Sequence, residues 1–136
     1  MTQTICPEQG AGRGYDSAAG HAAQLFQAMA DTTRLRCLVL LAAHGELCVC
    51  ELVHALDLSQ PKISRHLRLL RDCGLVADRR ERIWVHYRLA DSQPCWLRPT
   101  LDALIAESGD SAPFAHDTRR LATMPDRPDG SDGACP

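Results

Sequence analysis

Hydrophobic residues recur every three or four positions along most of the chain, which is the spacing of amphipathic helices. Four such segments follow one another, over residues 18–30, 32–45, 47–56 and 60–73. Apolar and polar residues then alternate in two short runs that predict the strands of a β-hairpin, 75–78 and 83–89. A last helical segment spans 94–107. The pattern therefore predicts a mainly α fold with a small β-hairpin, in the order α-α-α-α-β-β-α.

The two ends of the chain lack this periodicity. Residues 1–16 are rich in Gly, Gln and Thr, whereas the sequence beyond residue 107 is rich in Gly, Ser, Asp and Pro. Such segments have too little apolar surface to fold by themselves. We therefore expect a mobile N-terminal arm over 1–16, a single domain over 17–107 and a disordered C-terminal tail over 108–136, in a chain of one domain's length.

Composition narrows the class of protein. Hydrophobic residues make up 45% and charged residues 24% of the 136-residue chain, which is typical of a soluble globular protein. The longest apolar run, residues 38–43, is too short to cross a bilayer, and the first residues contain no secretory signal, so we expect a cytoplasmic protein with no membrane partner. In a reducing compartment the seven cysteines are expected to be thiols rather than disulfides.

Positive charge is concentrated in one part of the chain. The net charge is −2, but residues 59–90 contain eight Lys and Arg against three Asp and Glu. A short helix, a break and a second helix with a basic outer face have the order of a helix-turn-helix, whose second helix enters the major groove. Gln pairs with adenine edges, and Arg binds guanine or phosphate. The residues predicted to contact double-stranded DNA from this helix and the hairpin are Ser59, Gln60, Lys62, Ser64, Arg65, His66, Arg68, Arg80 and Arg82.

Three strings resemble the ArsR/SmtB family of metalloregulatory repressors, and most closely its arsenite-responsive members: ELCVCEL at 46–52, SQPKISRHL at 59–67 and WVHYRL at 84–89. The resemblance covers about residues 18–107. It implies a winged helix-turn-helix fold and a homodimer whose interface is formed by the first and last helices. It also implies a repressor that leaves its operator DNA when a metal or metalloid binds.

Cys48 and Cys50 are the residues on which the sensing chemistry is expected to depend. Thiolates are the ligands that soft ions prefer, and the start of a helix lowers the pKa of a thiol. A spacing of two on a regular helix places the side chains about 200° apart, so one ion cannot hold both unless the helix unwinds or begins late. We hypothesise that bound As(III) distorts the helix over residues 47–56. This distortion would tilt the recognition helix over residues 60–73 and weaken DNA binding by about 1 to 3 kcal/mol.

The arsenite-responsive members that this chain resembles often carry a third cysteine three residues after the pair, but Val53 stands at that position here. Cys6, which resembles the arm cysteines of cadmium- and lead-responsive members, and Cys95 are the candidates for a third ligand. If only two thiols are present, they would satisfy the valence of methylarsenite. We therefore expect As(III), methylarsenite or another thiophilic metal ion as the inducer, and no organic cofactor.

Other functions compete with this interpretation. The same cysteines could make a thiol redox-sensing repressor or a cadmium- or lead-type sensor of the same fold. A DNA-binding architectural module without an inducer is a third alternative, which the Cys-x-Cys pair argues against. An enzyme is not expected, because the chain has no Gly-rich phosphate loop and no carboxylate pair at a pocket.

Overall fold

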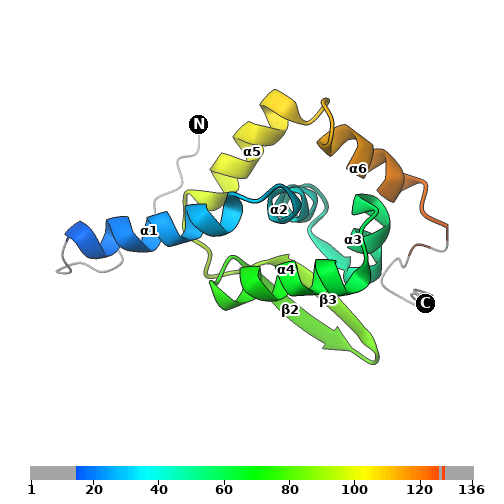
Figure 1. Ribbon diagram of the computed structural model, residues 1–136, viewed down its shortest axis with the longest axis horizontal. Helices are drawn as coiled ribbons and strands as arrows, with labels where there is room; N and C mark the ends of the chain where they lie inside the picture. Colours follow the sequence, from blue (N-terminus) through cyan, green and yellow to red (C-terminus); the bar gives the residue numbers. More distant parts are fainter. Residues whose placement is uncertain (1–14, 126, 128–136) are drawn as a thin grey trace.

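The computed structural model describes residues 15–125 and 127 of the chain. Its helices and strands are, in order, α1 (Tyr15–Met29), α2 (Thr32–His44), β1 (Glu46–Cys48), α3 (Val49–Leu56), α4 (Gln60–Asp72), β2 (Val76–Glu81), β3 (Trp84–Leu89), α5 (Leu97–Ser108) and α6 (Phe114–Ala122) (Figure 1). The predicted fold class, mainly helical with a small sheet, is confirmed. Within these residues no helix is long and apolar enough to cross a membrane.

The hydrophobic core is built around α2, which lies at the centre of the helices (Figure 1). Its Leu38 and Leu41 are completely buried. They belong to the same core cluster as Leu52 of α3, Leu67 of α4 and Leu101 of α5. Because α3 and α4 share this core, a change in the position of one of them changes the packing of the other.

Local sequence explains where the central helices begin and end. Asp31 precedes α2, and its carboxylate accepts a hydrogen bond from the backbone N–H of Arg34 at 3.0 Å. Gly45 ends α2 with φ at 88°, a conformation that favours glycine. Ser59 begins α4 in the same way as Asp31 begins α2, since its hydroxyl accepts from the N–H of Lys62 at 3.4 Å.

The sheet contains one more strand than the sequence pattern predicts. Its order is β1-β3-β2, with both pairs antiparallel. The predicted hairpin is present, but β2 continues to Glu81, so the turn is limited to Arg82 and Ile83 rather than residues 79–82. β1 was not predicted because three residues are too few to show alternation. It pairs Cys48 with His86, so the strand before α3 is part of the same sheet as the hairpin.

The predicted disorder of the tail over 108–136 is wrong for the part that the structure describes. α6 lies within that range, and its Leu121 and Asp117 are buried against the rest of the molecule. The reason is tertiary: Leu121 joins the hydrophobic core, and Asp117 pairs with Arg36 of α2. Most of the predicted arm over 1–16, Cys6 included, lies outside the described residues.

Candidate DNA-binding surface and cysteine pair

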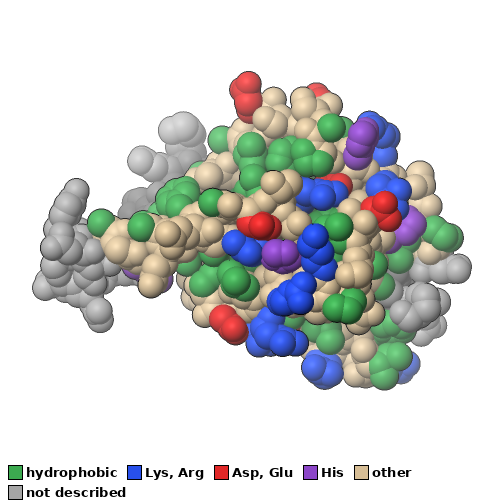
Figure 2. Space-filling model, in the orientation of Figure 1, with side chains coloured by type: hydrophobic (Ala, Val, Ile, Leu, Met, Phe, Trp, Pro, Cys, Tyr) green, Lys and Arg blue, Asp and Glu red, His purple; other side chains and the backbone are tan. Residues whose placement is uncertain are grey.

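The second helix of the helix-turn-helix, α4, has one buried side and one basic side. Ile63, Leu67 and Leu70 are completely buried. The opposite side is exposed to solvent and is polar or basic, and Figure 2 shows Lys and Arg side chains gathered over α4 and the hairpin. The predicted DNA-contacting residues that are exposed in the structure are Ser59, Gln60, Lys62, Arg65, Arg68, Arg80 and Arg82, and Ser64 is half-buried beside them.

His66 differs from the other predicted DNA-contacting residues because its side chain is only 17% exposed. Its Nδ1 atom lies 3.2 Å from a guanidinium nitrogen of Arg34 and 3.9 Å from the carboxylate of Asp31. His66 therefore connects the recognition helix to the first turn of α2. Sequence reasoning missed this contact because Asp31 and His66 are far apart in the chain.

Burial lowers the pKa of His66 below its usual value, although the carboxylate of Asp31 opposes the shift. The cations of Arg34, Lys62 and Arg65 lower the pKa further. The folded state thus favours neutral His66. Its contribution to the free energy of unfolding is present above about pH 6.5 and is lost as the pH falls through the lower pKa of the folded state.

We expect the urea midpoint of unfolding to fall between about pH 7.5 and pH 5.5, and to fall less in His66→Gln than in the wild type. Burial also lowers the pKa of His44, so the variant removes only part of the effect. His116→Gln on the exposed side of α6 is the matched control and should follow the wild type. If the urea midpoint fell equally between the two pH values in His66→Gln and His116→Gln, the role of His66 would be contradicted.

Two arginines near the predicted surface are engaged in internal ion pairs. Arg71 of α4 donates to the carboxylate of Asp78 of β2 at 3.2 Å, which links the recognition helix to the hairpin. Arg79 lies within 2.7 Å of the carboxylates of both Glu46 and Glu81, and these pairs raise its pKa above the usual value. Arg79 therefore stabilises the sheet. Arg80 and Arg82 of the hairpin are also exposed, and neither forms an ion pair within the described residues.

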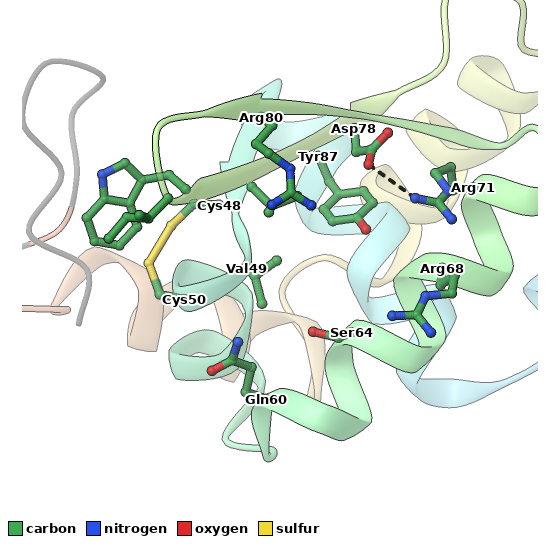
Figure 3. Close-up of a pocket in the computed structure, with 13 residues that line it drawn as sticks. Cys48, Val49, Cys50, Gln60, Ser64, Arg68, Arg71, Asp78, Arg80 and Tyr87 are labelled. Atoms are coloured by element: carbon green, nitrogen blue, oxygen red, sulfur yellow. Dashed lines mark hydrogen bonds and ion pairs between the residues drawn. A yellow bond between two sulfur atoms is a disulfide. The ribbon is translucent and has the colours of Figure 1, made fainter.

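A hollow of about 300 Å³ lies between the start of α3, α4 and the hairpin (Figure 3). Cys48 and Cys50 border it on one side, and Gln60, Ser64 and Arg68 border it from α4. The cysteine pair is thus next to the surface that is predicted to contact DNA.

The two cysteines are brought together because α3 begins late. Cys48 ends β1 with an extended backbone, at φ −82° and ψ 163°, and the helix starts only at Val49. The 200° separation of a regular helix therefore does not apply, and the two sulfur atoms are joined in a disulfide. Cys48 is buried and Cys50 is half-buried. The prediction of free thiols is wrong for this pair, since the strand-to-helix junction places both sulfurs on the same side.

The other cysteines have different environments. Cys37 is completely buried in α2, and burial raises the pKa of its thiol to about 12. Cys73 donates from its thiol to the carbonyl of Leu70. Cys95, which precedes α5, is disulfide-bonded, so the prediction of a free thiol is wrong for this residue as well. Among the residues that the structure describes, no group of three or more His, Cys, Asp and Glu could hold a metal ion.

A basic recognition helix followed by a basic β-hairpin defines a winged helix-turn-helix DNA-binding protein. Residues 31–78 match the family model described as the bacterial regulatory protein, arsR family. The chain belongs to this family of transcriptional regulators, as the three strings in its sequence predict.

Three similar proteins illustrate the relationship. An arsenic resistance transcriptional regulator of Pseudomonas putida is 48% identical over 104 residues, which cover 76% of this chain and 80% of that protein. An arsenical resistance operon repressor of Escherichia coli is 57% identical over 79 residues, which cover 58% of this chain and 68% of that protein. A homodimeric winged helix-turn-helix DNA-binding domain of Mycobacterium bovis has a TM-score of 0.58 at 28% identity, covering 74% of this chain and 91% of that one. Both sequence relatives are transcriptional regulators, which favours a function other than catalysis.

Proposed function

We propose that this protein is a cytoplasmic, metalloid-responsive repressor that binds operator DNA as a homodimer. It is released when As(III) or a related trivalent arsenical binds Cys48 and Cys50. The observation that carries this proposal is the position of the cysteine pair, at the start of α3 and beside the same hollow as Gln60, Ser64 and Arg68 of the recognition helix. Two relatives act in arsenic or arsenical resistance, which supports the choice of ligand.

The chemistry requires the pair in its reduced form. Each thiol that replaces a hydroxyl group on trivalent arsenic forms one As–S bond and releases one water molecule. Methylarsenite is satisfied by the two thiols of Cys48 and Cys50, whereas arsenite has a third position. Val53 cannot supply a third ligand, because its side chain is apolar and packs against the hydrophobic core. The proposed sources of a third thiol are Cys6 and, once its own disulfide is reduced, Cys95.

The cysteine pair has two direct structural connections to the DNA-binding surface. Leu52 of α3 and Ile63 of α4 lie in one core cluster, so a distortion of α3 displaces the recognition helix. Cys48 also pairs with His86 of β3, so the same distortion reaches the hairpin. A coupling free energy of about 1 to 3 kcal/mol through these contacts would lower operator affinity by about 5- to 150-fold.

The proposed dimer uses α1 and α5. Figure 1 shows α1 extending away from the central helices. Phe26 of α1 is 49% exposed and stacks on Trp96, which precedes α5, with ring centroids 4.5 Å apart. The exposed ring of Phe26 on a protruding helix provides apolar surface of the kind that homodimers bury. The homodimeric domain of Mycobacterium bovis supports a homodimer.

Binding of an operator fragment, followed by fluorescence anisotropy under reducing conditions, tests the proposal. Arsenite and methylarsenite are expected to release the wild type and Cys73→Ser, the matched control, whose half-buried thiol lies at the end of α4. Cys48→Ser and Cys50→Ser are expected to stay bound, with the half-release concentration raised at least about 100-fold, because one thiolate cannot chelate the ion. Cys6→Ser and Cys95→Ser identify any third ligand. Normal release of Cys48→Ser would refute the assignment.

The disulfide favours a second candidate function, a repressor that senses oxidation. In that case Cys48 and Cys50 form their S–S bond while an oxidant such as hydrogen peroxide takes up two electrons and two protons and becomes water. Titration of the same DNA complex with peroxide, and separately with cadmium, distinguishes the alternatives. Release by peroxide alone would identify a redox switch, and release by cadmium alone would identify a thiolate metal sensor.

A further inference from the structure

α6 and Arg127 contact both ends of α3, the helix that begins after Cys48. At the C-terminal end, the Nε atom of Arg120 donates to the backbone carbonyl of His54 at 3.0 Å. Arg36 of α2 donates to the carbonyl of Leu56 at 3.1 Å. These carbonyls belong to the last turn of α3, where no helical N–H group is available to them.

Asp117 of α6 holds Arg36 in place for this contact. Both carboxylate oxygens of Asp117 accept from the guanidinium group, at 2.8 and 2.7 Å, and Asp117 is only 1% exposed. A paired geometry of this kind fixes the direction of a guanidinium group. The contact of Arg36 with α3 therefore depends on α6.

At the N-terminal end of α3, the contact runs through Glu51. One oxygen of this carboxylate accepts from the backbone N–H of Cys48 at 2.8 Å, and the other accepts from the Nε atom of Arg127 at 2.6 Å. Glu51 is only 4% exposed. The residue that holds the backbone of the first cysteine in place is itself held by a residue from beyond α6.

These contacts matter because α3 has only eight residues. A helix of two turns has few internal hydrogen bonds, and its stability depends on its ends and its packing. Cys48 and Cys50 lie at its first turn, so any ligand that draws both sulfurs onto one atom acts on the segment that Glu51 holds.

We propose that α6 and Arg127 form a C-terminal clamp that holds α3 at both ends and sets the inducer concentration at which the repressor leaves DNA. Arg120 and Arg127 are positioning residues in this device, since they act on the cysteines through α3 and touch no inducer. The inference rests on the proposed function. A weaker clamp lets the first turn of α3 rearrange more easily, so the inducer acts at a lower concentration.

The test uses the reduced, full-length protein and phenylarsine oxide as the probe. Arg120→Ala and Arg127→Ala are compared with Arg119→Ala, an exposed arginine on the same helix. The first two variants are expected to lower the half-release concentration about three- to tenfold and to accelerate amide hydrogen exchange in α3. Operator affinity without the probe is expected to match the wild type. Arg127→Lys, which keeps the charge next to Glu51, is expected to restore most of the wild-type behaviour.

Each outcome decides a specific point. Equal half-release concentrations in all three alanine variants would overturn the clamp while leaving the proposed function intact. Weaker operator binding without the probe, together with an unchanged half-release concentration, would assign these arginines a general structural role and would also overturn it. If phenylarsine oxide did not release even the wild type, the proposed function would be wrong, and the inference would fail with it.

Discussion

Replacing Asp117 by alanine is expected to lower the free energy of unfolding by about 3 kcal/mol, because it leaves the guanidinium group of Arg36 without its paired carboxylate in a mostly buried position. The side chain of Arg36 is only 17% exposed, so water compensates little for the loss. Equilibrium unfolding in urea, followed by circular dichroism, measures the effect.

Asp110→Ala is the matched control, since it removes an exposed carboxylate from the segment between α5 and α6. We expect this variant to unfold within about 0.5 kcal/mol of the wild type, as is usual for exposed positions. If Asp117→Ala were as stable as the control, the Arg36–Asp117 pair would not be what holds α6 on the core.

The double variant Arg65→Ala/Arg68→Ala is expected to bind operator DNA about 100-fold more weakly at physiological salt. Both side chains are exposed on α4, and neither forms a hydrogen bond or an ion pair within the described residues. The guanidinium groups are therefore available for phosphate or guanine. Each phosphate contact that is removed should also reduce the dependence of log affinity on log salt concentration by about one unit.

Anisotropy titrations at several salt concentrations measure both quantities. Arg119→Ala on α6 serves again as the control, because α6 packs against α2 and α3 rather than against the hairpin. An unchanged salt dependence in the double variant would show that α4 does not contact the phosphates, and the assignment of the recognition helix would have to be revised.

The main elements of the fold could be predicted from the sequence because their signals are local. The side chain of Ser59 marks the start of α4, and the backbone of Gly45 marks the end of α2. The apolar residues of α4 recur with a clear helical period. α6 could not be predicted in this way. Its stability comes from Leu121 in the core and from the pair between Asp117 and Arg36, whose residues lie 81 positions apart.

The candidate site, like the fold, could be predicted from the sequence only in part. The late start of α3 was predicted as a condition for a shared ligand, and the structure places Cys48 in an extended strand before the helix. The structure also places His66, which was predicted to contact DNA, in an internal contact, and Arg79 in two ion pairs. A residue type and its spacing do not reveal a partner that tertiary folding supplies.

The strand β1 gives the hairpin a support that it would otherwise lack. A two-stranded hairpin in water is only marginally stable, and a third strand makes it a sheet. Here the third strand consists of Glu46, Leu47 and Cys48, which pair with Arg88, Tyr87 and His86. The wing is therefore supported by the three residues that end in the first cysteine, so the sheet of the hairpin and the proposed inducer site share one short piece of backbone.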